Sequence, residues 1–230
     1  MFDLTPAEFE ALRLSVKVGL VSMAASLPVG FGLAYLLARC DFPGKSLVNG
    51  FVLLPLVLPP VVTGLVLLML FGSQGPIGRF FEQTLGVTFA FRWTGAALAA
   101  AVMGLPLMVR AMRLSIEAVD RRLELAARTL GARRWRTFLT ITLPLSLPGV
   151  LAGAILSFAK SFGEFGATIT FVSNIPGETQ TLPIAIYSLL QTPGGDGPAL
   201  RLAALSVIVS MIAIVGAEWV ERRVRTARPA

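Results

Sequence analysis

Residues 120–144 combine arginines, small side chains and leucines in a pattern suited to docking against another protein rather than to catalysis. Asp120 is a candidate N-cap, and Gly131 is a candidate left-handed residue after the C-cap, so together they frame a helix of about ten residues. One face of that helix is apolar and mostly small: Leu123, Ala126, Ala127 and Leu130. The remainder is largely charged: Arg121, Arg122, Glu124 and Arg128.

Small side chains allow a backbone to lie close in a partner's groove, and Gly131 permits a turn into a second helix near Arg133. A plain connector could be far shorter than this segment, which favours a docking role. The alternative is an interfacial helix that rests on the membrane with its arginines against lipid phosphates.

Few other side chains offer chemistry. The chain has no histidine and a single cysteine, Cys40, which excludes imidazole metal ligands, the usual general base and an intramolecular disulfide. We therefore expect no metal and no cofactor. Gly44, Lys45 and Ser46 resemble the end of a phosphate-binding loop, but Arg39 occupies the place of its first glycine and no strand precedes it. If ATP is hydrolysed, the site must lie on another polypeptide.

The elements that position these residues are membrane spans. The chain is 55% hydrophobic and only 14% charged, with a mean hydropathy of +0.76, and is too apolar for a soluble globule. Apolar stretches of membrane-spanning length lie near residues 15–38, 47–71, 94–112, 141–163 and 202–220. We predict an all-α integral membrane protein with about five spans in one transmembrane domain, residues 1–230, in which residues 117–140 form the loop after the third span. The first segment is too long for a signal peptide and is expected to be retained.

The distribution of the basic residues indicates how the chain is oriented in the membrane. Fourteen of the twenty fall in three alternate connections: Arg39 and Lys45; Arg110, Arg113, Arg121, Arg122, Arg128, Arg133, Arg134 and Arg136; Arg222, Arg223, Arg225 and Arg228. The positive-inside rule places all three connections in the cytoplasm, with the N-terminus outside and the C-terminus inside. The net charge of +7 alone would allow a nucleic-acid surface, but each basic cluster abuts an apolar span, so we expect no nucleic-acid partner.

Within the spans, Pro55, Pro59 and Pro60 make a straight second helix improbable; the bend could line a pathway or be a packing kink. Gly149 and Gly153 form a Gly-x-x-x-Gly pair that allows close helix approach, which we expect within one chain, with a contact between two chains as the alternative. Residues 164–199 hold no full span, and the apolar run from Leu182 to Leu190 is expected to be a re-entrant or surface helix.

The spacing of the arginine-rich segment resembles a known loop. Ala126-Ala127, three residues, Gly131, nine residues and then Ile141-Thr142-Leu143-Pro144 match the EAA loop of binding-protein-dependent ABC importer permeases. Leu125 stands where that motif has its Glu, and Glu124 comes one residue earlier. The resemblance implies a type I importer permease fold. The residues that it assigns to ATPase coupling are Glu124, Ala126, Ala127, Leu130, Gly131, Ile141, Leu143 and Pro144.

The resemblance also implies the partners: cytoplasmic ABC ATPase subunits, an extracytoplasmic oxyanion-binding protein and a second permease copy, all at a bacterial inner membrane. Residues 158–190 look very like the same region of molybdate importer permeases, with sulfate and tungstate permeases as related alternatives. The chain itself is then a transport subunit and not an enzyme. A self-sufficient carrier should show inverted repeats or acidic residues within the membrane spans. An intramembrane enzyme should show a cluster of polar residues within the spans. None of these features is evident in the sequence.

Lys160 and Glu164 are the charged pair of that region. They lie four residues apart, and on one helix face they can pair, in the less favourable orientation. Near the outer mouth they could be a gate or a contact for the binding protein; equally, they could be an interfacial ion pair without consequence. Nothing in the sequence makes a convincing high-affinity oxyanion site, which needs convergent Arg, Ser/Thr or backbone N–H donors.

Overall fold

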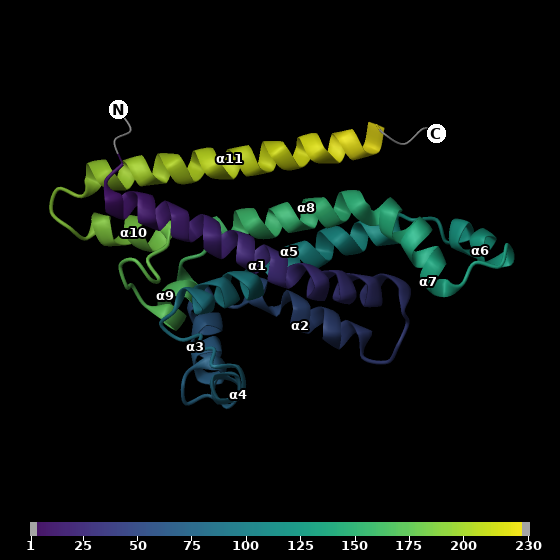
Figure 1. The fold of residues 1–230 in the computed structure, drawn as a ribbon, viewed down its shortest axis with the longest axis horizontal. Coiled ribbons are helices and arrows are strands. Elements are labelled where there is room, and N and C mark those ends of the chain that lie inside the picture. Colours follow the sequence, from purple (N-terminus) through teal and green to yellow (C-terminus); the bar gives the residue numbers. More distant parts are fainter. Residues whose placement is uncertain (1–3, 227–230) are drawn as a thin grey trace.

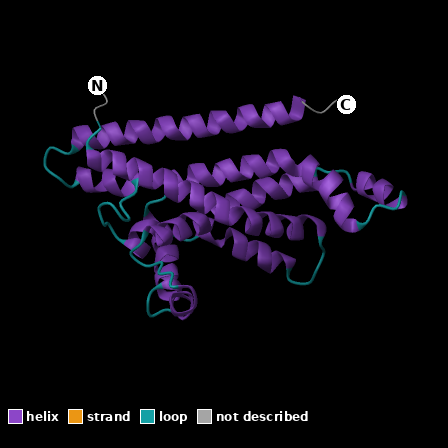
Figure 2. Cartoon of the chain, viewed as in Figure 1, coloured by secondary structure: helices purple, strands orange, loops and turns teal. Residues whose placement is uncertain are grey.

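The regular structure is entirely helical in the computed structural model, which describes residues 4–226 (Figure 2). The helices are α1 (Pro6–Arg39), α2 (Lys45–Val57), α3 (Pro60–Phe71), α4 (Pro76–Leu85), α5 (Trp93–Glu117), α6 (Arg121–Thr129), α7 (Arg134–Thr137), η1 (Phe138–Thr142), α8 (Leu143–Phe162), α9 (Gly166–Val172), α10 (Leu182–Leu190) and α11 (Asp196–Thr226). The all-α prediction is confirmed. Of the basic residues used for topology, Arg228 lies outside the described residues.

Four helical stretches of the described chain are long and apolar enough to cross a membrane: Pro6–Arg39, Trp93–Glu117, Arg134–Phe162 and Asp196–Gly216. The second predicted span is instead a pair of helices, α2 and α3, and the chain bends by 114° between them. If this bent pair counts as one span, the number of spans is five, in agreement with the predicted fold class.

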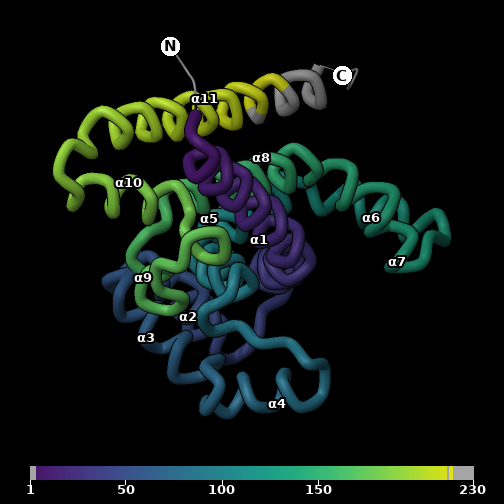
Figure 3. Tube along the Cα trace, turned by 60° about the vertical axis from the view of Figure 1, so that its left-hand side comes forward, coloured from purple at the N-terminus to yellow at the C-terminus, as the bar shows by residue number. Residues whose placement is uncertain are grey.

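The break between α2 and α3 lies at the prolines. Pro59 and Pro60 have no N–H to continue the hydrogen bonding of α2, which therefore ends at Val57, while Pro60 sits comfortably at the start of α3. Helix α3 turns out of the bundle and packs on α9, and α4 follows it at the edge of the molecule (Figures 1 and 3). A Cβ on Gly64 would lie 2.6 Å from the carbonyl oxygen of Ala167, so this packing depends on a missing side chain.

Helix α5 is the centre of the bundle, because it packs against both α1 and α8. Its small residues permit close approach: Ala96, Ala97, Ala99 and Ala100 are all buried. On α8, a Cβ at Gly149 would clash with the side chain of Ser115 in α5, and one at Gly153 would lie 2.8 Å from the carbonyl oxygen of Met108. The Gly-x-x-x-Gly contact therefore lies within one chain, as expected.

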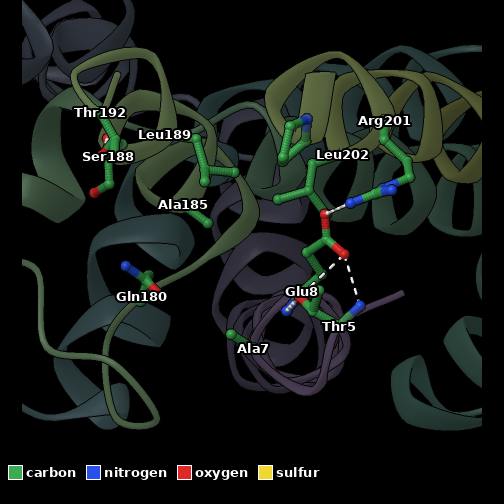
Figure 4. A pocket seen from close by; sticks show the side chains of 11 residues that line it. Thr5, Ala7, Glu8, Gln180, Ala185, Ser188, Leu189, Thr192, Arg201 and Leu202 are labelled. Atoms are coloured by element: carbon green, nitrogen blue, oxygen red, sulfur yellow. Dashed lines mark hydrogen bonds and ion pairs between the residues drawn. The ribbon is translucent and has the colours of Figure 1, made fainter. Parts of the chain in front are cut away.

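A polar cluster ties the start of the chain to its last helix. Thr5 caps α1 in a capping box, in which the Glu8 carboxylate accepts a hydrogen bond from the Thr5 N–H at 2.7 Å. The same carboxylate is only 5% exposed and pairs with Arg201 of α11 at 2.7 Å (Figure 4). The cluster borders a cavity of about 240 Å³ beneath α10 and α11. It fixes the first turns of two apolar helices through Glu8 and Arg201, which are 193 residues apart in sequence.

The segment between α8 and α11 contains two short helices. Helix α10, Leu182–Leu190, matches the predicted apolar run and is too short to cross a membrane. Helix α9 was not recognised from the sequence. At the opposite end of the longest axis from α10, helices α6 and α7 project beyond the ends of α5 and α8 (Figure 1).

Candidate docking site

The projecting loop begins with the helix that the sequence predicts. Helix α6 spans Arg121–Thr129, and the side chain of its N-cap Asp120 accepts a hydrogen bond from the Arg122 N–H at 2.9 Å. The helix dipole also favours acidic side chains at this end, and Glu124 lies in the first turn. Both the capping residue and the length of the helix are therefore confirmed.

The turn after α6 is a Schellman motif around Gly131. The Gly131 N–H donates to the Arg128 carbonyl at 3.1 Å, and the Ala132 N–H donates to the Ala127 carbonyl at 3.0 Å. Gly131 has φ +88°, a left-handed conformation in which a side chain is strained. The chain then enters α7 with Arg133 as its N-cap, as the sequence predicts within one residue.

The outer surface of this loop is apolar as well as basic. Leu123 is 49% exposed, Leu130 is 89% exposed and Trp135 is 69% exposed. Ala126 is also exposed and Ala127 half-buried, so the small-residue face predicted from the sequence is open to a partner. A set of large apolar side chains on a loop so rich in arginine is typical of a protein-interaction surface.

Glu124 anchors the inner side of α6 to the bundle. Its Oε1 pairs with Arg39 Nη2, at the end of α1, at a distance of 3.0 Å. The same oxygen accepts a hydrogen bond from Thr142 Oγ1, in the fourth span, at 2.7 Å. Arg39 Nη2 also donates to the Val119 carbonyl just before α6, at 3.0 Å. One carboxylate thus joins the loop to two membrane spans.

The fourth span enters the bundle through a π-turn. Residues Phe138–Thr142 form η1, and Leu143 donates its N–H to Phe138 in the wider pattern. Pro144 comes directly after Leu143 and has no backbone N–H. A continuous α-helix would therefore lack one hydrogen bond at this position. Of the predicted coupling residues, Ile141 lies in η1, and Leu143 and Pro144 form the first turn of α8. They adjoin the Glu124 contact but lie on a different element from α6.

Lys160 and Glu164 pair as predicted, with Lys160 Nζ 2.7 Å from Glu164 Oε2. The expectation that they share one helix face is wrong, because α8 ends at Phe162 and Glu164 lies in the turn before α9. Glu164 is 2% exposed, and its other oxygen accepts a hydrogen bond from the Ala167 N–H at 3.0 Å. The carboxylate therefore holds the first turn of α9, a role that a superficial ion pair would not have.

A family model described as the binding-protein-dependent transport system inner membrane component matches residues 26–226, which include the whole docking loop. The chain belongs to this family. It is 58% identical over 219 residues to the molybdenum transport system permease protein ModB of Escherichia coli strain K12, covering 95% of this chain and 96% of that protein. It is 35% identical over 206 residues to the sulfate transport system permease protein CysW of Synechococcus elongatus, covering 88% and 72%.

A solved structure has the same fold. The crystal structure of a bacterial alginate ABC transporter in complex with an alginate pentasaccharide-bound periplasmic protein contains a chain that matches 97% of this chain, with a TM-score of 0.75. That match covers 83% of the other chain at 17% sequence identity, so it supports the fold alone. The importer-permease resemblance recognised from the loop spacing is confirmed at the level of family and fold.

Sequence reasoning missed the partners of Glu124. The displaced acidic residue was identified, but Arg39 served only to indicate topology and to exclude a phosphate-binding loop. The available signal was an arginine at the end of an apolar stretch, which needs a carboxylate nearby if it is buried. Because Arg39 and Glu124 are far apart in the sequence, their spacing could not show that they meet.

Proposed function

We propose that the chain is the membrane-spanning permease subunit of an ATP-driven importer that moves molybdate across the bacterial inner membrane. The high identity to a molybdenum transport permease over nearly the full length of both chains supports the cargo. The identity to a sulfate permease is much lower and makes sulfate the second candidate. A separate ATPase supplies the energy, and an extracytoplasmic binding protein delivers the oxyanion.

The observation that carries the proposal is the geometry of the docking loop. Its apolar face projects from the bundle, where an ATPase groove can receive it, and its inner face is tied through Glu124 to α1 and to the fourth span. A displacement of the loop by the ATPase is therefore passed directly to two membrane helices. In this proposal Ala126, Ala127, Leu130 and Gly131 dock, and Ile141, Leu143 and Pro144 form the joint to the span.

The proposed orientation follows from the charge distribution. The arginine-rich loop and the C-terminal end lie in the cytoplasm, and the N-terminal end lies outside. Two copies of the chain surround one pathway, each with one ATPase. On the outer side, Lys160 and Glu164 are proposed to hold the α8–α9 turn as part of an outer gate or a contact for the binding protein.

Energy coupling is necessary because the cargo is a dianion. Entry into a cell that is negative inside costs about 4.6 kcal/mol per 100 mV for two charges. Each tenfold concentration gradient adds about 1.4 kcal/mol. A passive pore would release the oxyanion instead of accumulating it.

The test is reconstitution of the permease, its ATPase and its binding protein in proteoliposomes. We expect molybdate uptake that depends on ATP on the cytoplasmic side, with tungstate accepted because it has almost the same size. Sulfate uptake as efficient as molybdate uptake would replace the cargo assignment, and uptake without ATP would refute the pump.

A further inference from the structure

A positively charged cavity lies between the docking loop and the end of α1. Its volume is about 450 Å³, and residues of α6 and of the start of the fourth span line it. The charged residues that line it are four arginines and one carboxylate: Arg39, Arg121, Arg128, Arg134 and Glu124. Glu124 is already paired with Arg39, which leaves three arginines in excess. Charges of one sign gathered around a cavity favour an anionic occupant.

Arg39 gives a second and independent indication of a ligand. Its side chain is only 8% exposed, and its Nε has no hydrogen-bond partner among the described residues. Its Nη2 is shared between Glu124 and the Val119 carbonyl. A buried guanidinium group normally has its donors satisfied, so the cluster around Arg39 is incomplete as the protein alone provides it.

An apolar groove continues from this cavity toward the middle of the membrane. It has a volume of about 420 Å³ and is lined by Phe31, Gly32, Tyr35, Arg134, Trp135 and Phe138. Tyr35, Arg134 and Phe138 line both spaces. The rings of Tyr35 and Phe138 pack edge to face, with centroids 5.4 Å apart. Gly32 precedes Arg39 by seven residues of α1 and so lies about 10 Å deeper along the helix axis.

We propose that this composite site binds an anionic phospholipid of the inner leaflet. The headgroup phosphate occupies the cavity against Arg128 and Arg134, near Arg39, and one acyl chain follows the groove past Gly32. A free phosphate or oxyanion would use the arginines but would leave the aromatic groove unfilled. A lipid uses both, because it joins an anionic headgroup to an apolar chain.

The bound lipid would contact α1, α6 and the start of the fourth span together. These are the elements that Glu124 connects. The lipid would therefore stabilise the position of the docking loop relative to the bundle. The proposal uses the cytoplasmic placement of the loop from the proposed function, but it does not depend on which oxyanion is transported.

The experiment measures lipid retention by the purified permease–ATPase complex with native mass spectrometry. The probes are phosphatidylglycerol and phosphatidylcholine with identical acyl chains, each added at the same concentration. We expect phosphatidylglycerol to be retained at least about fivefold better, because its headgroup has a net negative charge whereas that of phosphatidylcholine is zwitterionic. A factor of about five is the attraction expected between one arginine and an anionic lipid surface. Equal retention of the two lipids would overturn the proposal without any variant.

Two variants locate the site. Gly32→Leu fills the groove and leaves every charge in place, since a Cβ at Gly32 meets nothing within 4 Å. Its matched control is Gly216→Leu, at an equally open glycine on α11. Arg134→Gln removes one charge from the cavity, and its control is Arg79→Gln on the distant helix α4. Of these four variants, only Gly32→Leu and Arg134→Gln should reduce the preference for phosphatidylglycerol.

Two further arms separate the possible anions. Inorganic phosphate and molybdate at millimolar concentration should leave phosphatidylglycerol bound, because neither fills the groove. Displacement of the lipid by either ion, with no effect of Gly32→Leu, would mean that the cavity is a free-anion site and would refute the lipid assignment. If the lipid preference holds while molybdate uptake fails, the cargo proposal alone is wrong.

Discussion

At the scale of single residues, Glu124 explains how a departure from the loop motif can be accommodated. The motif has its acidic side chain at the position of Leu125, which here is 58% exposed. Glu124 is one residue earlier and reaches both Arg39 and Thr142. An acidic residue at position 125 would leave the buried Arg39 without this partner unless the helix rotated.

Glu124→Gln should weaken the anchoring of the loop. The substitution keeps the shape but removes the charge that balances Arg39, and hydrogen bonds to charged groups contribute about 1.5–3 kcal/mol each. We expect a lower Tm of the purified complex and less uptake per ATP hydrolysed. The matched control is Asp41→Asn, which breaks an exposed pair with Lys45 at 2.9 Å.

The control is expected to have little effect, since exposed pairs contribute about 0–1 kcal/mol. The hydrogen bond from Lys45, with its positive charge, lowers the pKa of the Asp41 carboxyl, so that group is ionised throughout the neutral pH range. Identical Tm and coupling for the two variants would show that Glu124 has no anchoring role.

At the scale of elements, capping chemistry was readable from the sequence and tertiary contacts were not. Asp120 and Gly131 act through neighbours a few residues away, and both ends of α6 were predicted correctly. The break at Pro59 was predicted as a bend, but its size depends on how α3 packs against α9. Helix α9 itself has seven residues and is held by Glu164, so its sequence carries no helical period to detect.

Gly131→Val should separate docking from membrane insertion. A β-branched residue at φ +88° is strained by about 1–2 kcal/mol and would reorient α7 relative to α6. There is open space around Gly131, so the strain comes from the backbone and not from a clash. Gly131→Asn should therefore retain far more uptake than Gly131→Val, as measured in proteoliposomes with equal amounts of complex. Equal uptake by the two variants would exclude the hinge role.

Gly153→Ala should destabilise the contact between α8 and α5. The added methyl group would lie 2.8 Å from the carbonyl oxygen of Met108, and backbone atoms cannot move aside as a flexible side chain can. Overpacking of this kind costs about 1–3 kcal/mol. We expect a reduced Tm, whereas Gly216→Ala, in open space on α11, should leave the Tm unchanged or raise it. An unchanged Tm for Gly153→Ala would mean that the two helices are less closely packed.

At the scale of the whole molecule, hydropathy and charge predicted the class and the approximate number of spans, and the spacing of the loop motif predicted the family. Hydropathy and charge are sums over many residues, so the class and the number of spans do not depend on local errors such as the missed α9. The candidate lipid site is different, because its residues come from α1, α6, α7 and η1 and show no shared pattern in the sequence. Only the folded chain brings Arg39 next to Arg128 and Arg134.

The proposed topology predicts the accessibility of Cys40. This residue is the C-cap of α1, is half-exposed and lies at the end of the molecule that carries the docking loop. A membrane-impermeant maleimide should leave it unlabelled in intact spheroplasts and label it in inside-out vesicles. The reverse pattern would invert the orientation of the chain without affecting the fold.

The π-turn at the base of the fourth span is a joint at which the winding of that helix can change. The helix from Arg134 to Phe162 has 29 residues and is about 43 Å long, so it reaches from the docking loop to the turn that holds Glu164. Conversion of η1 to α-helix would rotate the helix on one side of this joint relative to the other side by about 100° and shift it by about 1.5 Å. Thr142 belongs to this joint and donates a hydrogen bond to Glu124. A change in the winding of the helix would therefore weaken or strengthen the hydrogen bond that holds the loop. A displacement of the docking loop can thus be converted into a change of helical register at η1.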